Sequence, residues 1–360
     1  MGGADALRIA KTLANGSAKT RTMIRMETDR VSELLARAVA ARVTPAAAVG
    51  VVTGEAIVAI AYGGAADVTT GQPLTPAHRF DLASLTKTLV TLPEILDLLA
   101  AGSADLAAPL ADFWPRAQRR PVGALTLAEL LSYRGGLPAS PPYYLERHGE
   151  QAVFDAYLAT VPEQRDPAVA VYSDVCFAIA GRLVTDLTGC SLAELAQRRT
   201  GLVFTPVPGP AVATERCPWR QRLIVGEVHD ENASAAGGVS GHAGAFGTAV
   251  EVAGAVQRWL QAVLAGGLAE ATTRQWSIGG AGERFGLGWW LPPTWAVAGS
   301  HSGPGSFGAS GFVGNRIWVE PCRGYGVVVL TNRIHPVRTV DRARFDSWVG
   351  CLLDNIAGLT

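Results

Sequence analysis

The chain has 360 residues, 48% of them hydrophobic and 17% charged, so it can bury a large core spread over two lobes and is not a disordered protein. Its formal net charge is zero and its arginines are scattered among acidic residues, which argues against nucleic acid as a partner. The sequence has no run of about 18 apolar residues, so a membrane is not an expected partner either.

The N-terminal residues 1–27 contain basic residues but lack the apolar stretch of a signal peptide, and we expect them to form a flexible tail. The five cysteines are widely spaced and include no Cys-x-x-Cys pair. That pattern is typical of free thiols in a reducing compartment. Both features favour a cytoplasmic location.

The first predicted elements are a helix and a hairpin. Apolar residues recur at helical spacing over 29–42, which predicts an amphipathic helix. Two apolar runs follow, Ala46–Thr53 and 55–62, separated by Gly54. They predict a pair of adjacent strands.

The middle of the chain is rich in helix signals. Ser/Thr-x-x-Glu patterns that begin at Thr91, Thr126 and Ser191 predict capped helix starts. Near the C-terminus, the apolar runs Arg316–Glu320 and Tyr325–Thr331 flank a turn and predict a second strand pair, and a helical pattern closes the chain.

Strands at both ends with helices between them predict an α+β fold. We expect an antiparallel sheet flanked by N- and C-terminal helices, with an inserted all-helical lobe. The predicted division places 28–82 and 240–360 in the α/β lobe and 83–239 in the helical lobe, within one domain over 28–360. The cleft between the lobes is the expected site.

Lysine is rare in this chain, with only three lysines against 28 arginines. One of them, Lys87, lies three residues after Ser84, and positions i and i+3 share one face of a helix. Arginine does not lose its proton in a protein, whereas a buried lysine does. We therefore expect burial to lower the pKa of Lys87 until it accepts the proton of a nucleophilic Ser84. The same spacing arises by chance in roughly every chain of this size, so other motifs must support it.

A second candidate element is Tyr172-Ser173-Asp174, directly before an apolar run suited to a buried helix. In one interpretation Tyr172 presents its hydroxyl to the cleft and relays a proton. In the other, Tyr172 is a packing residue and Asp174 caps the helix, and the residues alone favour this second interpretation.

Together these motifs resemble the serine β-lactamase and penicillin-binding-protein superfamily, in particular its class C-like branch, over about residue 28 to the C-terminus. The resemblance rests on residues 80–87 as the first motif and on the helix and Gly-Leu-Pro loop of 125–138. It also rests on Tyr172-Ser173-Asp174, the aspartate form of the Tyr-x-Asn or Tyr-Ser-Asp element, and on the stretches 226–233 and 238–244. It implies a β-lactamase/transpeptidase-like fold. By this resemblance Ser84 is the nucleophile, Lys87 its base, and Tyr172 the residue that helps to activate the serine and protonates the leaving group.

The third motif of that family, Lys-Thr-Gly or His-x-Gly on the strand lining the cleft, is altered here. His301-Ser302-Gly303 has the expected letters, but the spacing back from Trp318 leads to Ala309-Ser310-Gly311. We prefer the spacing, because the register of a strand is fixed by its neighbours.

Ala309 then replaces a cation that supports the family's catalytic network and helps to hold a substrate carboxylate. Lys87 becomes the only expected cation of the catalytic centre, and a strong dependence on a substrate carboxylate is not expected. His301 is a candidate substitute from a neighbouring loop. The predicted substrate-binding residues are Asp174, Ala309, Ser310, Gly311 and His301.

The resemblance assigns the oxyanion hole to the backbone N–H groups of Ser84 and Phe312, and one such donor typically contributes about 3 kcal/mol in acyl transfer. His229-Asp230-Glu231 lacks the spacing of metal ligands and is interpreted as a polar strand end or a cleft rim. His242 is interpreted as a local hydrogen-bonding residue. We expect no metal or other cofactor, and the sequence has no Gly-x-Ser-x-Gly elbow of an α/β-hydrolase.

The leading hypothesis is a serine acyl hydrolase that forms an acyl-enzyme at Ser84. Small esters, D-amino-acid peptides and β-lactams all fit the chemistry, and esterase or peptidase activity ranks above β-lactamase activity. The alternative is a binding protein that has lost turnover because Ala309 replaces the third-motif cation.

Overall fold

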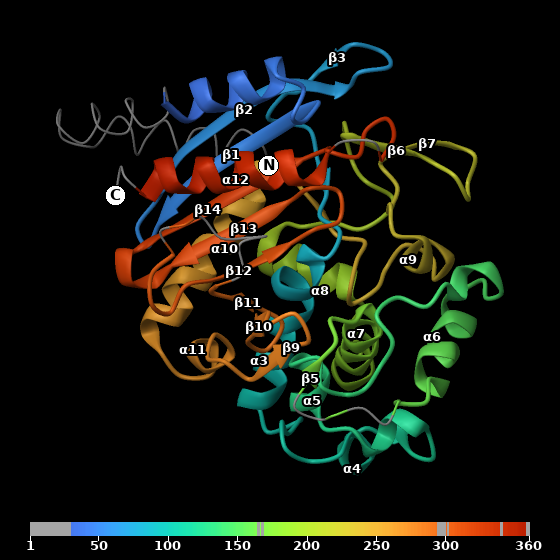
Figure 1. Ribbon diagram of the computed structural model, residues 1–360. Coiled ribbons are helices and arrows are strands. Elements are labelled where there is room, and N and C mark those ends of the chain that lie inside the picture. The colour runs from blue at the N-terminus through green and yellow to red at the C-terminus, as the bar shows by residue number, and fades with distance from the viewer. Residues whose placement is uncertain are drawn as a thin grey trace.

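A large sheet forms the centre of the fold (Figure 1). The computed structural model describes residues 30–163, 166, 169–293, 300, 302–338 and 341–357. Neighbouring strands are antiparallel, except that β5 runs parallel to β9 at one edge. The strand order across the sheet is β3 (Gln72–Pro73), β2 (Ile57–Asp67), β1 (Ala46–Thr53), β14 (Tyr325–Thr331), β13 (Arg316–Glu320), β12 (Phe307–Ser310), β11 (Trp290–Leu291), β10 (Arg284–Phe285), β9 (Ser277–Gly279) and β5 (Val169–Ala170).

The first and last long strands of the chain are neighbours in this sheet, where β1 lies between β2 and β14. One face is covered by the helix of residues 30–40 and by α12 (Arg342–Ala357), and the other by α10 (Ala249–Ala265) (Figure 1). Because both faces are covered, seven of the eight residues of β1 are buried, without the alternation of a half-exposed strand.

The segment between β4 and α10 forms most of the predicted helical lobe. It also contains the small β6–β7 hairpin and β5, so the inserted segment is not purely helical. Its helices and its short strands are α3 (Leu92–Ala100), α4 (Leu110–Phe113), α5 (Leu127–Leu131), α6 (Glu150–Ala159), α7 (Asp174–Thr188), α8 (Leu192–Thr200), α9 (Glu231–Ala235), β6 (Ala213–Cys217) and β7 (Arg222–Val225). A short pair, β4 (Phe80–Asp81) and β8 (Phe246–Gly247), joins its two ends, and α11 (Leu268–Thr272) follows α10.

The α+β fold with a mostly antiparallel sheet is confirmed, as are β1, β13 and β14 with the predicted bounds. The capping boxes at Thr126 and Ser191 begin α5 and α8 as predicted. The predicted start at Thr91 is wrong, because a π-helical turn over Lys87–Thr91 continues directly into α3. The Thr91 hydroxyl instead donates to the carbonyl oxygen of Gly241 at 2.7 Å.

The five cysteines all lie in the described part of the chain and are free thiols, as predicted. Among the described helices, none alone combines the length and apolar composition of a membrane span, and α7 and α8 reach that limit only as a pair bent by 86°. The predicted tail, residues 1–27, lies outside the described residues.

Candidate active site

Ser84 lies in a tight turn between β4 and the π-helical turn that begins at Lys87. The preceding residue, Ala83, has a φ of 46°, a left-handed conformation that costs a non-glycine residue roughly 1 kcal/mol. Its backbone N–H donates to Oδ1 of the buried Asp81 at 2.7 Å, which holds the turn. The Ser84 side chain is left partly exposed at the end of a helical segment.

Lys87 brings three predicted site residues together. Its side chain is buried, and its Nζ donates to Ser84 Oγ at 2.9 Å and to Asp174 Oδ1 at 2.7 Å. The same Nζ lies 4.8 Å from the centroid of the Tyr172 ring. Ser84, Lys87, Tyr172 and Asp174 therefore form one contiguous group.

The structure reverses the expected direction of the Lys87 pKa shift. Burial by itself acts to lower the pKa of Lys87, but the charge of Asp174 and the interactions of the amine with Asp174 and Tyr172 outweigh it. The pKa of Lys87 therefore lies above its usual range, and the resting lysine is charged. Asp174 stands where the family pattern allows a neutral asparagine, and its carboxylate is the principal cause of this difference.

Tyr172 combines the two interpretations made from the sequence. Its ring stacks on Trp290 with centroids 5.2 Å apart and packs on Tyr133 at 4.8 Å. It also lines the cavity that contains Ser84. Asp174 is not the helix cap, because Ser173 occupies that position and Asp174 opens α7 with its carboxylate turned to Lys87.

A cavity of about 470 Å³ lies over this group. Of the predicted residues, it is lined by Ser84, Tyr172, Asp174, Ser310, Gly311 and Phe312. Ala309 lies on β12 with only 4% of its surface exposed, opposite Ile317 on β13, and does not line the cavity. His301 lies outside the described residues.

Gly311 brings the end of β12 against the nucleophile turn. A Cβ at Gly311 would lie 2.8 Å from the carbonyl oxygen of Leu82 and 3.4 Å from Cβ of Ala83. Only glycine permits this approach without a shift of the backbone. The amide of Phe312, the predicted second oxyanion donor, follows directly after this contact.

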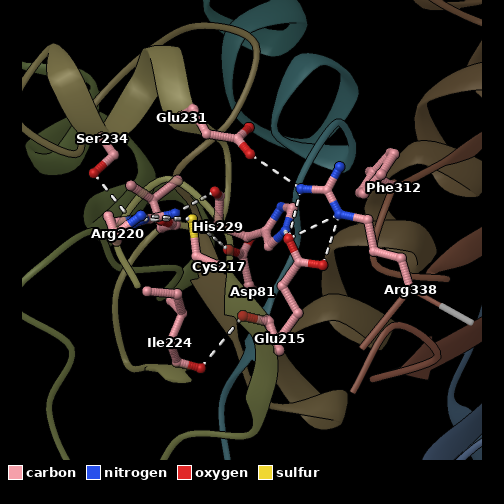
Figure 2. Close-up of polar contacts among 12 residues, drawn as sticks. Asp81, Glu215, Cys217, Arg220, Ile224, His229, Glu231, Ser234, Phe312 and Arg338 are labelled. Carbon is pink, nitrogen blue, oxygen red and sulfur yellow. Dashed lines mark hydrogen bonds and ion pairs between the residues drawn. The ribbon is translucent and has the colours of Figure 1, made fainter. Parts of the chain in front are cut away.

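Phe312 lines the cavity and contacts both a histidine and an arginine, His229 and Arg338, which Figure 2 shows beside it. The His229 ring stacks on it with centroids 5.4 Å apart, and the Arg338 guanidinium lies 4.9 Å from its centroid. Both neighbours are fixed by Glu215, which accepts from Arg338 at 2.5 to 2.8 Å and bonds to His229 Nε2 at 2.8 Å. Glu231 accepts at 3.0 Å from Nη2 of Arg338, the same atom that donates to Glu215.

Asp81 joins this wall to the nucleophile turn. Its Oδ2 accepts from the backbone N–H of His229 at 2.6 Å, and its carbonyl oxygen accepts from Asn315 Nδ2 at 2.7 Å. Arg220 holds the same peptide segment from the other side by donating to the His229 carbonyl oxygen (Figure 2). Burial raises the pKa of Asp81, although its bonds to His229 and Ala83 oppose that rise.

The stretch His229-Asp230-Glu231 sends its side chains to three different partners rather than to one centre. His229 bonds to Glu215, Asp230 to Nε2 of His242 at 3.0 Å, and Glu231 to Arg338. Nδ1 of His242 bonds to Ser240 Oγ at 2.8 Å, so its role is local hydrogen bonding beside the cavity. Burial acts to raise the pKa of Asp230, but the charge of His242 and its hydrogen bond hold that pKa well below its usual range.

The expectation of a single cation in the catalytic centre is wrong. Four arginines line the cavity besides the predicted residues: Arg316, Arg333, Arg338 and Arg342. They come from β13, from the segment after β14 and from the start of α12. Two signals were present in the sequence: the density of arginines between positions 333 and 344, and the Thr331-Asn332-Arg333 strand end, which was used only to set the register of the third motif.

Comparison with known proteins gives a consistent result. A sequence family described as Beta-lactamase matches residues 31–347. A protein of Escherichia coli K12, named provisionally as a D-alanyl-D-alanine carboxypeptidase, is 28% identical over 313 residues, covering 72% of this chain and 70% of that protein.

Two solved structures show the same fold. The crystal structure of SurE has a TM-score of 0.69 and 20% identity, covering 93% of this chain and 77% of that one. A class C β-lactamase from Rhodobacter sphaeroides has a TM-score of 0.64 and 20% identity, covering 92% of this chain and 99% of the other. At these identities the two structures carry information on the fold alone.

Proposed function

This chain belongs to the β-lactamase family of serine hydrolases, and on that basis we propose that it hydrolyses acyl compounds through a covalent acyl-enzyme at Ser84. One observation carries the proposal. The Ser84 hydroxyl faces a cavity of about 470 Å³ and lies 2.9 Å from the amine of the buried Lys87. A hydroxyl within hydrogen-bond reach of an amine is the arrangement that nucleophilic catalysis needs.

The proposed first step is attack of Ser84 Oγ on the substrate carbonyl carbon. The serine proton passes to Nζ of Lys87, which must be in its neutral form. The N–H groups of Ser84 and Phe312 stabilise the oxyanion that forms. Tyr172 donates a proton to the leaving group, the bond between the carbonyl carbon and the leaving group breaks, and water later releases the acid from Ser84.

The charge state of Lys87 has a direct kinetic consequence. Because the pair with Asp174 keeps the resting lysine protonated, only a small fraction of the enzyme carries the neutral base at neutral pH. The acylation rate is therefore expected to increase with pH across the neutral and mildly alkaline range.

For the substrate, we propose D-amino-acid peptides and related small esters ahead of β-lactams. The provisional name of the Escherichia coli relative supports the peptide class. The Tyr172 and Trp290 rings give the cavity one aromatic wall, and an acyl chain can pack there.

The experiment that tests the proposal is covalent labelling of the intact chain with a fluorophosphonate and, separately, with a penicillin, followed by peptide mass spectrometry. We expect a fluorophosphonate adduct on Ser84 that is absent from the Ser84→Ala variant. Labelling by the fluorophosphonate alone favours an esterase or peptidase. A folded chain that forms no adduct with either reagent contradicts the proposal and favours a binding protein without turnover.

A further inference from the structure

The arginines around the cavity differ in how their charges are neutralised. Arg338 lies between two carboxylates, those of Glu215 and Glu231. The carboxylates on the opposite wall are also engaged, since Asp174 pairs with Lys87 and Asp230 with His242. None of these four acids is available to the remaining arginines.

Arg333 and Arg342 share much less negative charge. Among the residues that the structure describes, Arg342 has one carboxylate partner, Asp346, at 3.4 Å, and 72% of its side chain is exposed. That same carboxylate already accepts from the buried Arg316 at 2.9 Å. Within the described ranges, no carboxylate lies within ion-pair distance of Arg333, whose Nη2 donates to the Phe312 carbonyl oxygen at 3.1 Å.

The excess positive charge contributes to lowering the pKa of two guanidinium groups. Burial lowers the pKa of Arg333, and the positive charge of Arg342 lowers it further, against the opposing charge of Asp346. The pKa of Arg316 falls to about 10, chiefly through burial, with further contributions from Arg333 and Arg342 that oppose the effect of Asp346. An anion placed between Arg333 and Arg342 would relieve this repulsion.

Arg333 is also held in position before any ligand arrives. Its guanidinium lies 5.5 Å from the centroid of the Phe345 ring, and its Nη2 donates to the residue that carries the predicted second oxyanion donor. A guanidinium fixed in this way loses little freedom when it binds a carboxylate. It lies on the same cavity as Ser84.

We propose that Arg333 and Arg342 form a carboxylate-binding subsite and that the substrates turned over at Ser84 carry a negatively charged carboxylate. This inference rests on the proposed function. It replaces the expectation, made from Ala309, that a substrate carboxylate contributes little. The two cations of this subsite come from the segment after β14 and from the first turn of α12, whereas the third motif of the family would supply a cation from β12.

The test uses pairs of aryl esters that differ only in a carboxylate or a carboxamide. In one pair this group is on the leaving group and in the other on the acyl group, and kcat/KM is measured for each ester. For the wild-type chain we expect the carboxylate ester to be preferred by about 10- to 100-fold in at least one pair, the range of charge-assisted hydrogen bonds. In the double variant Arg333→Gln, Arg342→Gln this ratio should fall to about one.

Because kcat/KM of the carboxylate ester is divided by kcat/KM of the carboxamide ester for the same variant, a general loss of catalytic activity cancels out. If the double variant does not fold, Arg342→Gln alone is used, because that side chain is largely exposed. Arg344→Gln is the matched control: it removes the same charge from the same helix, but its side chain is bonded to the carbonyl oxygen of Ala41 and is not among the cavity-lining residues. The control should keep the wild-type ratio.

Three results overturn the inference while leaving the proposed function intact: a ratio near one in both wild-type pairs, a ratio that survives in the double variant, or an equal loss in Arg344→Gln. If no ester is turned over and Ser84 takes no fluorophosphonate, the proposed function fails. Calorimetric binding of the carboxylate and carboxamide esters then decides the subsite. Equal affinity of the two for the wild-type chain overturns it, and a preference for the carboxylate that the double variant loses supports it.

Discussion

Replacing Asp174 by asparagine tests whether one carboxylate sets the protonation state of Lys87. The substitution keeps the shape of the side chain but removes the charge 2.7 Å from Nζ. With that charge gone, burial is the dominant influence and the pKa of Lys87 falls. The amine then becomes available as a base at lower pH.

The size of the effect follows from the ion pair. A hydrogen bond to a charged group contributes about 1.5 to 3 kcal/mol, and each 1.36 kcal/mol changes the neutral fraction of a lysine about tenfold below its pKa. Asp174 is 18% exposed, so screening by solvent places the effect toward the lower part of that range. We expect fluorophosphonate labelling of Ser84 to be faster by roughly 10-fold in Asp174→Asn at neutral pH.

The assay is the second-order rate of labelling, measured by mass spectrometry from about pH 6 to about pH 9, with the rise expected at lower pH in the variant. Asp186→Asn is a matched control, because Asp186 lies on the same helix, is also 18% exposed and pairs with Arg116 and Arg182. A lysine whose folded pKa is raised stabilises the fold below its unfolded pKa near 10.4 and loses that contribution as pH rises through the folded value. Each variant loses an ion pair and should therefore be less stable at neutral pH. Only Asp174→Asn should change the labelling profile.

A labelling profile of Asp174→Asn that coincides with the wild type, or that moves to higher pH, refutes this reasoning. A slower reaction across the whole range also refutes it, since Asp174 would then be needed for proton transfer and not only for the charge of the lysine. Thermal unfolding of the variant must be cooperative for any of these results to count.

Two further predictions concern the cavity walls. Gly311→Ala places a Cβ 2.8 Å from the Leu82 carbonyl oxygen and should lower kcat by about 10- to 100-fold in an ester assay, whereas Gly54→Ala, with no atom within 4 Å, should leave kcat unchanged. Burial acts to raise the pKa of Glu215, but the hydrogen bonds that Glu215 makes lower this pKa from 4.5 to about 2. The ionised carboxylate therefore stabilises the fold above its ordinary pKa, and this contribution is lost as the pH falls toward 2. Glu215→Gln should cost roughly 3 kcal/mol in chemical denaturation at neutral pH, and a difference that does not shrink with falling pH contradicts this account.

Several parts of the fold could be predicted because they depend on local patterns. Apolar runs and turns specify β1, β13 and β14, and the capping boxes specify the starts of α5 and α8. Thr91 has the same capping pattern, but the helix is already formed before it. A pattern of four residues does not show whether the chain upstream is helical.

The electrostatics of the site could not be predicted, because they depend on contacts between distant residues. The spacing of Ser84 and Lys87 indicated their proximity, but the pKa of Lys87 is set by Asp174, 87 positions further on. Arg333 reaches the cavity because β14 ends beside the turn after β12. In the sequence, Thr331-Asn332-Arg333 served only to set the register of the third motif and gave Arg333 no role in the site. The loss of a cation was inferred from the position of Ala309 on β12. That position gives no information about the arginines that other segments bring to the cavity.

The position of Asp81 has a mechanical consequence. Its two carboxylate oxygens and its carbonyl oxygen bind residues 83, 229 and 315, so one buried residue joins the nucleophile turn, the wall that supports Phe312 and the turn after β12. Moving any one of these segments alone breaks a buried hydrogen bond to Asp81, at a cost of about 1 to 3 kcal/mol. The catalytic end of the cavity is thus stiff, and adaptation to different substrates is left to the largely exposed Arg342 at the rim, which Asp81 does not bind.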